Sequence, residues 1–162
     1  MIRLFYYYHL ALVRRQQSTP EQIESALAYD ILSERIPHLY IVEETKNVLL
    51  RRYAIAAQPV LQKVHVLEKG RYLKRWARRL RRNFGFSREV GFMLAYGTFG
   101  VDVTRKTVGV DLLVTTDIKL VNEYRQNFPT IHEKLQSLLR NLPSPYGELE
   151  LPVLRAIGEI TE

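Results

Sequence analysis

The sequence predicts an α/β fold with a mostly parallel sheet. Segments rich in β-branched and aromatic residues alternate along the chain with segments of helical periodicity, which is the order that a parallel sheet requires. The strand-like segments cover residues 2–13, 48–56 and 89–96, and the helix-like segments cover residues 19–35, 70–83 and 130–142. The chain has 162 residues, 46% of them hydrophobic, which is enough for a single domain over residues 1–162 with a sizeable core.

Capping residues set the ends of these helices. Thr19 has the side chain of an N-cap, and Pro37 ends the helix that follows it. Gly85 follows the second helix and can supply the left-handed residue that closes it. Thr130 is the expected cap of the third helix, with Glu133 at the capping-box position.

Four other segments complete the expected pattern. Residues 97–107 contain two glycines and a polar run, so we expect a loop there. Residues 143–147 have the composition of a turn, and the segment from residue 149 begins like a strand. Residues 110–124 fit a helix or a strand equally well from periodicity alone.

A single segment, residues 69–88, carries the net charge of the chain. It holds nine Lys or Arg and no acid, and the other residues have 15 Lys or Arg against 17 Asp or Glu, so the total of +7 arises here. At helical spacing its apolar residues form one stripe, made of Leu73, Trp76, Ala77, Leu80 and Phe84. Cations cover most of the remaining helix surface.

Like charges at these spacings repel by about 0.2–0.5 kcal/mol per pair. We expect such a helix to be held by its buried stripe and by an anionic partner, usually phosphate. A merely solvated face is the alternative, and a membrane surface fits less well because the stripe is short and Trp76 is better interpreted as a core anchor. The expected contacts with RNA or single-stranded nucleic acid are Arg71, Lys74, Arg75, Arg78, Arg79, Arg82, Arg105 and Lys106.

Composition excludes several classes of protein. The absence of cysteine excludes disulfides, cysteine–zinc sites and thiol nucleophiles. The histidines lie far apart in the sequence and show no zinc-site spacing. No apolar run reaches the roughly 18 residues that span a bilayer, and no signal-peptide cleavage site follows the apolar N-terminal run. We therefore expect a cytoplasmic protein that does not enter membranes.

Two carboxylates, Asp111 and Asp117, lie six residues apart in an otherwise apolar segment. Buried carboxylates need a partner, and Mg²⁺ or Mn²⁺ takes oxygen ligands of this kind. On a helix the two would be about 120° apart, so they share one cation only if Asp111 begins the helix and Asp117 lies within it. The alternative is that Asp111 caps the helix and Asp117 is exposed beside Lys119.

The segment Val108-Gly109-Val110-Asp111, with Asp117 six residues later, resembles the Asp motif of NYN domains, which belong to the PIN-like nucleases. The order of elements over about residues 2–125 is similar as well, with Arg52-Tyr53-Ala54-Ile55 at the second strand of the family. The resemblance implies a three-layer PIN-like fold and a metal-dependent ribonuclease in which Asp111 and Asp117 are catalytic and bind Mg²⁺ or Mn²⁺.

Two acidic positions of that family are absent. Tyr7 stands where the first strand should end in Asp, and no Ser-Gly-Asp-Gly-Asp-Phe strand follows Asp117. Three functions stay open: a nucleic-acid-binding module with a silent site, an active ribonuclease completed by a second subunit, and a mainly α-helical small subunit of a ribonucleoprotein effector complex. The expected partners are accordingly RNA, a second copy of the chain, or a larger complex.

Overall fold

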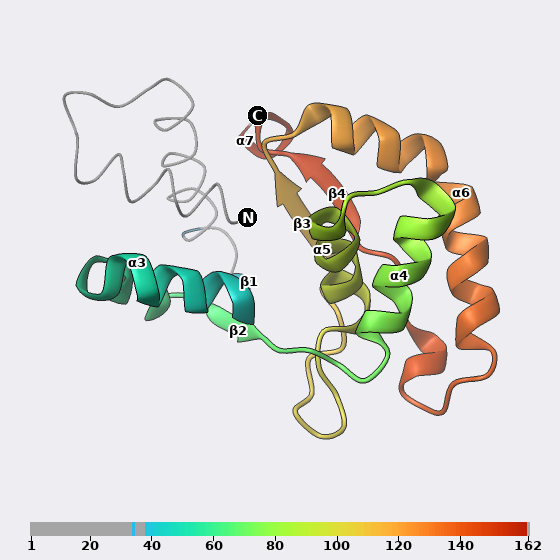
Figure 1. Ribbon diagram of the computed structural model, residues 1–162, viewed down its shortest axis with the longest axis horizontal. Coiled ribbons are helices and arrows are strands. Elements are labelled where there is room, and N and C mark those ends of the chain that lie inside the picture. Colours follow the sequence, from blue (N-terminus) through green and yellow to red (C-terminus); the bar gives the residue numbers. More distant parts are fainter. Residues whose placement is uncertain (1–33, 35–37, 162) are drawn as a thin grey trace. The chain divides into compact units, whose positions relative to one another are not determined.

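The computed structural model describes residue 34 and residues 38–161, which form a mixed α/β structure that is 58% helical (Figure 1). They divide into two compact units. One, which we call the helical unit, consists of Leu67–Leu113 and Asp117–Arg155, and the remaining described residues form the other. The strand expected at residues 2–13 lies outside the described residues, as does nearly all of the helix expected at 19–35.

Two pairs of short parallel strands make up the sheets of the described residues. Strand β1 (Tyr40–Val42) pairs with β2 (His65–Leu67), and helix α3 (Glu43–Leu61) connects them. Strand β3 (Leu112–Thr115) pairs with β4 (Val153–Ala156), and the connection contains α6 (Ile118–Leu139) and the 3₁₀ turn η1 (Tyr146–Glu148). Parallel partners need such crossovers. The α/β class is thus confirmed, whereas a three-layer PIN-like sheet is not.

The expected basic helix is confirmed as α4 (Leu73–Phe84). Gly85 ends it at φ 70°, in the left-handed region that glycine tolerates, and its N–H donates to the Arg81 carbonyl at 3.1 Å. Ser87 then begins α5 (Arg88–Phe99) by accepting a hydrogen bond from the Val90 N–H at 3.1 Å. The two helices run antiparallel, joined by this short turn (Figure 1).

The strand expected at residues 89–96 is wrong, because the structure has helix α5 there. A Cβ at Gly91 would lie 2.9 Å from Arg81 Cγ and 3.1 Å from the Ala77 carbonyl oxygen, so the two helices approach closely there. At the other end, a Cβ at Gly97 would lie 2.7 Å from Pro152 Cγ. Every residue from 94 to 100 is buried, so α5 lacks a polar face. An all-apolar helix has the same pattern as a buried strand.

Helix α3 corrects the strand expected at residues 48–56, and with it the second strand that the NYN resemblance places at residues 52–55. Glu43 and Glu44 occupy its first turn, where carboxylates complement the helix dipole. Alanines at positions 54, 56 and 57 favour the helix further. The apolar residues of this segment do not recur at one clear interval, which is why it resembled a strand.

Helix α6 begins earlier than the sequence suggests. Asp117 is its N-cap, accepting a hydrogen bond from the Leu120 N–H at 3.0 Å, and the helix continues through Pro129. Thr130 is therefore an interior residue and not a cap. A proline within a helix breaks its hydrogen-bond ladder and bends it, and Figure 1 shows α6 bending along its length.

The buried hydroxyl of Tyr124 connects α6 to the segment before β4. It donates a hydrogen bond to the Pro152 carbonyl at 2.8 Å, and burial raises the pKa of Tyr124 well above its ordinary value of 10.0. The expected turn at residues 143–147 is confirmed and leads into η1, whereas the strand expected from residue 149 begins only at Val153, as β4. Among the described residues, no helix is long and apolar enough to cross a bilayer.

Candidate nucleic-acid interface

The apolar stripe of α4 is the part of the helix that holds it in place. Leu73, Trp76 and Leu80 are all 0% exposed, and Ala77 is 1% exposed. Burying each of the three large side chains is worth about 1.5–3 kcal/mol. Against this stand six pairs of like charges three or four residues apart, which cost about 0.2–0.5 kcal/mol each. Burial outweighs repulsion, so the helix forms despite its charge.

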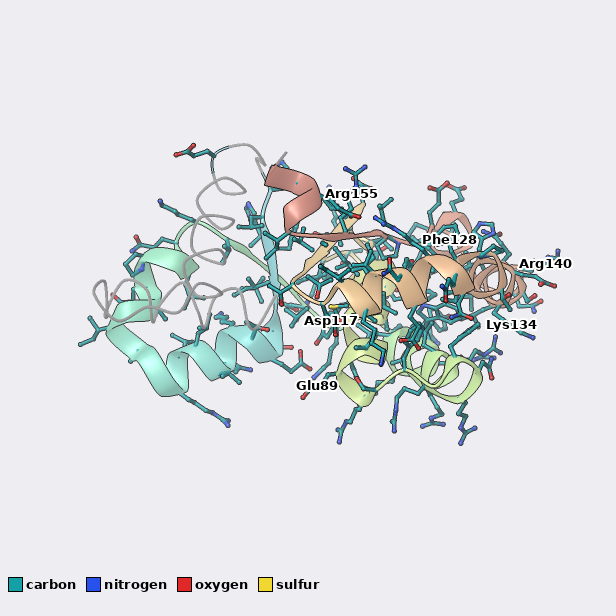
Figure 2. All side chains as sticks on the ribbon, turned by 90° about the horizontal axis from the view of Figure 1, so that it is seen from above. Glu89, Asp117, Phe128, Lys134, Arg140 and Arg155 are labelled. Atoms are coloured by element: carbon teal, nitrogen blue, oxygen red, sulfur yellow. The ribbon has the colours of Figure 1, made fainter. Side chains whose placement is uncertain are left out.

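The opposite side of α4 carries four cations that we call the basic ridge: Lys74, Arg75, Arg78 and Arg82. With about 100° per residue, they fall within an arc of roughly 100° centred away from the buried stripe. All four are exposed. Figure 2 shows nitrogen-tipped side chains extending from this side of the helical unit, away from α6.

No described acid neutralises the basic ridge. Among residues 34 and 38–161, none of its four members forms an ion pair. The first turn of α4 contains no acid, and Tyr72 at the N-cap position makes no side-chain capping hydrogen bond. Lys74 and Arg75 therefore lie at the positive end of the helix dipole with no acid in the first turn to offset them.

Two arginines flank the basic ridge. Arg79 is half-buried on the side of Trp76, and Arg81 lies on the side of α5, where its stem approaches Gly91. Arg81 is not among the contacts expected from the sequence, and its helical position lies next to the buried stripe. The structure leaves it exposed, since Gly91 provides room for its stem and the guanidinium reaches solvent.

The loop after α5 carries Arg105 and Lys106, both exposed. An antiparallel bridge between Lys69 and Gly100 joins the base of this loop to the segment just before α4. Both cations thus belong to a loop anchored at the N-terminal end of the basic helix (Figure 1). Arg105 is ion-paired with Glu68, and because both side chains are exposed the pair is weak and can exchange for a phosphate.

The two carboxylates of the Asp motif occupy opposite ends of β3. Asp111 is exposed just before the strand, and Asp117 is exposed just after it, as the N-cap of α6. Six extended residues span roughly 20 Å. The helical geometry that would let the two share one cation is therefore absent, and Asp117 takes the capping role that the sequence offered to Asp111. Among the described residues no three His, Asp or Glu side chains gather as metal ligands.

Two histidines that are distant in the sequence lie together in the structure. The rings of His38 and His65 have centroids 5.5 Å apart, and Tyr40 lies at the same distance from His65. Pairing of β1 with β2 causes this, since His65 donates its N–H to the Leu39 carbonyl. In the described part of the chain no third ligand completes a metal site around them.

Comparison with protein-family models, curated proteins and solved structures gives no match to this chain.

Proposed function

We propose that this protein binds nucleic acid, with RNA as the expected target, through the basic ridge of α4. One observation supports the proposal above the others. Six cations occupy one twelve-residue helix, and none of the described acids pairs with the ridge. The like charges reduce the stability of the free helix, whereas a partner with regularly spaced phosphates turns each of them into a favourable contact.

Under this proposal the cations expected from the sequence, together with Arg81, fall into three groups. The basic ridge provides the main phosphate contacts, and Arg79 and Arg81 extend it on either side. Arg71 precedes the helix, and Arg105 and Lys106 add charge from the neighbouring loop. Such contacts carry no base specificity, so the proposal is one of affinity and positioning.

A binding titration with labelled RNA in EDTA tests the proposal. We expect binding without a divalent metal and a logarithmic salt slope of about −0.7 for each phosphate contacted in a single strand. Absence of binding at about 50 mM salt would overturn the proposal.

The same titration distinguishes the two alternative functions. Cleavage of the RNA in Mg²⁺ or Mn²⁺ that disappears in Asp111→Asn would indicate the metal-dependent ribonuclease. Weak RNA binding by the isolated chain, with tight association to a larger ribonucleoprotein, would indicate the structural subunit. The proposed binding module instead binds RNA on its own and retains its affinity in EDTA.

A further inference from the structure

An aromatic cluster stands at the N-terminal end of α4. Tyr72, which directly precedes the helix, packs edge-on against Tyr146 with ring centroids 4.8 Å apart at 86°, and against Phe99 at 6.2 Å and 62°. Phe99 and Tyr146 are buried, at 0% and 3% exposed. Tyr72 itself is half-buried. Two buried rings thus fix its orientation while part of it reaches solvent.

A cation lies over the ring of Tyr72. The guanidinium carbon of Arg71 is 5.5 Å from the ring centroid, and the Arg71 side chain is exposed. A planar guanidinium above an aromatic face occupies the position that a nucleobase takes on a stacking platform, and it can itself stack on the far side of such a base. Arg71 and Tyr72 therefore have the residue types of a base clamp, in which the exposed Arg71 side chain moves outward to admit the base.

Charges of both signs lie near this cluster. Burial raises the pKa of Tyr146, the negative charge of Asp102 raises it further, and the positive charge of Arg71 lowers it. Asp102 would repel a phosphate that Arg71 attracts, whereas a neutral base can stack on Tyr72 without repulsion from Asp102.

The basic ridge begins where this cluster ends. Tyr72 precedes Leu73, the first residue of α4, and Lys74 and Arg75 follow within the same turn. One strand can therefore set its phosphates along the ridge and place a neighbouring base on Tyr72. A duplex keeps its bases paired inside and offers none for stacking unless it unpairs.

Building on the proposed function, we propose that Tyr72 is a stacking platform for an unpaired nucleobase, clamped by Arg71, and that the ligand of the basic ridge is single-stranded. The platform accepts any base, because every base has an aromatic face. Single-stranded RNA and single-stranded DNA share this chemistry. The experiment therefore includes both.

The test compares three oligonucleotides of about twelve nucleotides, single-stranded RNA, single-stranded DNA and duplex RNA, by fluorescence anisotropy. Tyr72→Leu keeps the apolar contact with Phe99 and Tyr146 but removes the ring. We expect it to bind single strands between about 5- and 150-fold more weakly, with an unchanged salt slope. Tyr72→Phe retains the ring and should restore the affinity. Phe128→Leu changes an exposed aromatic residue on α6, and its affinity should stay within about twofold of the original.

A spectroscopic measurement on the unmodified protein keeps the test decisive if Tyr72→Leu does not fold. An oligonucleotide containing 2-aminopurine loses fluorescence when that base stacks on a ring, so we expect quenching on binding. Unchanged affinity in Tyr72→Leu, no quenching by the unmodified protein, or tighter binding of the duplex than of either single strand would each overturn the platform. Loss of binding on neutralising the basic ridge would persist in those cases, so the proposed function would still stand.

Discussion

Neutralising the basic ridge should weaken RNA binding and stabilise the free protein at once. The triple variant Arg75→Gln, Arg78→Gln, Arg82→Gln breaks all six like-charge pairs of α4, because each pair includes at least one of these arginines. At about 0.2–0.5 kcal/mol per pair the gain is roughly 1–3 kcal/mol. Replacing Arg82, in the last turn, removes a favourable interaction with the helix dipole and costs about 0.3–1 kcal/mol. We expect a net gain of about 1 kcal/mol in the free energy of unfolding.

Binding should change in the opposite direction. Each arginine that no longer binds a phosphate reduces the salt slope for a single strand by about 0.7, so the triple variant should reduce it by about 2. The fall in affinity between about 50 and 200 mM salt then becomes some 15- to 20-fold smaller. Urea denaturation at low salt measures the stability, and anisotropy titrations at several salt concentrations measure the slope.

The matched control removes the same charge elsewhere. Lys119, Lys134 and Arg140 are exposed cations in or next to α6, and changing all three to Gln gives the same net charge. This control should keep the original salt slope. An equal fall in slope for both triple variants would refute the reasoning, because binding would then depend on net charge and not on the ridge.

Three further predictions concern the frame that holds α4. Tyr124→Phe removes the hydrogen bond to the Pro152 carbonyl and should cost about 1–3 kcal/mol in urea. Burial raises the pKa of Tyr124 above 10.0, so the unfolded chain releases this proton at a lower pH than the folded chain does. The contribution of Tyr124 to the free energy of unfolding should therefore be fully present below about pH 10 and decrease as the pH rises further. This decrease should be smaller in Tyr124→Phe. Asp117→Ala removes the N-cap of α6 and should lower the free energy of unfolding by about 0.5–2 kcal/mol. Asp111→Asn should change the free energy of unfolding by less than about 0.5 kcal/mol. An equal loss in both variants would contradict their placement at opposite ends of β3. Gly109→Ala should lower the midpoint of thermal unfolding more than Gly85→Ala does. Both glycines have positive φ, but a Cβ at Gly109 would lie 2.5 Å from the Gly97 carbonyl oxygen, whereas the space around Gly85 is open.

Helix α4 could be predicted from the sequence because its two faces differ sharply. Leu73, Trp76, Ala77 and Leu80 recur at helical spacing against an almost wholly cationic background, and all are buried. Gly85 marked its end correctly. The part of the candidate interface that lies on α4 could therefore be predicted from the sequence.

Elements without such contrast were predicted wrongly. Helix α5 is buried over most of its length, so no polar residues mark a helical period, and its Ser87 cap was not identified. In α6, Thr130 was predicted as an N-cap, yet the structure keeps the helix continuous across Pro129 and Thr130. Asp117 was identified as notable, but its capping role depends on where β3 ends, which periodicity did not define.

The aromatic cluster could not be found from the sequence. Tyr72, Phe99 and Tyr146 are far apart along the chain and come together only when α4, α5 and η1 pack in one unit. The contact between the rings of His38 and His65 has the same origin, since it depends on the register of β1 against β2. Contacts of this kind follow from tertiary packing and leave no local pattern.

Arginine-directed chemical modification, read by mass spectrometry with and without bound single-stranded RNA, tests the central claim most directly. Arg75, Arg78 and Arg82 should react in the free protein and be protected in the complex. Arg140 and Arg155, which are exposed but lie off α4, should react at the same rate in both states (Figure 2). Protection of Arg140 and Arg155 with continued reaction of the α4 arginines would place the nucleic acid elsewhere and contradict the account.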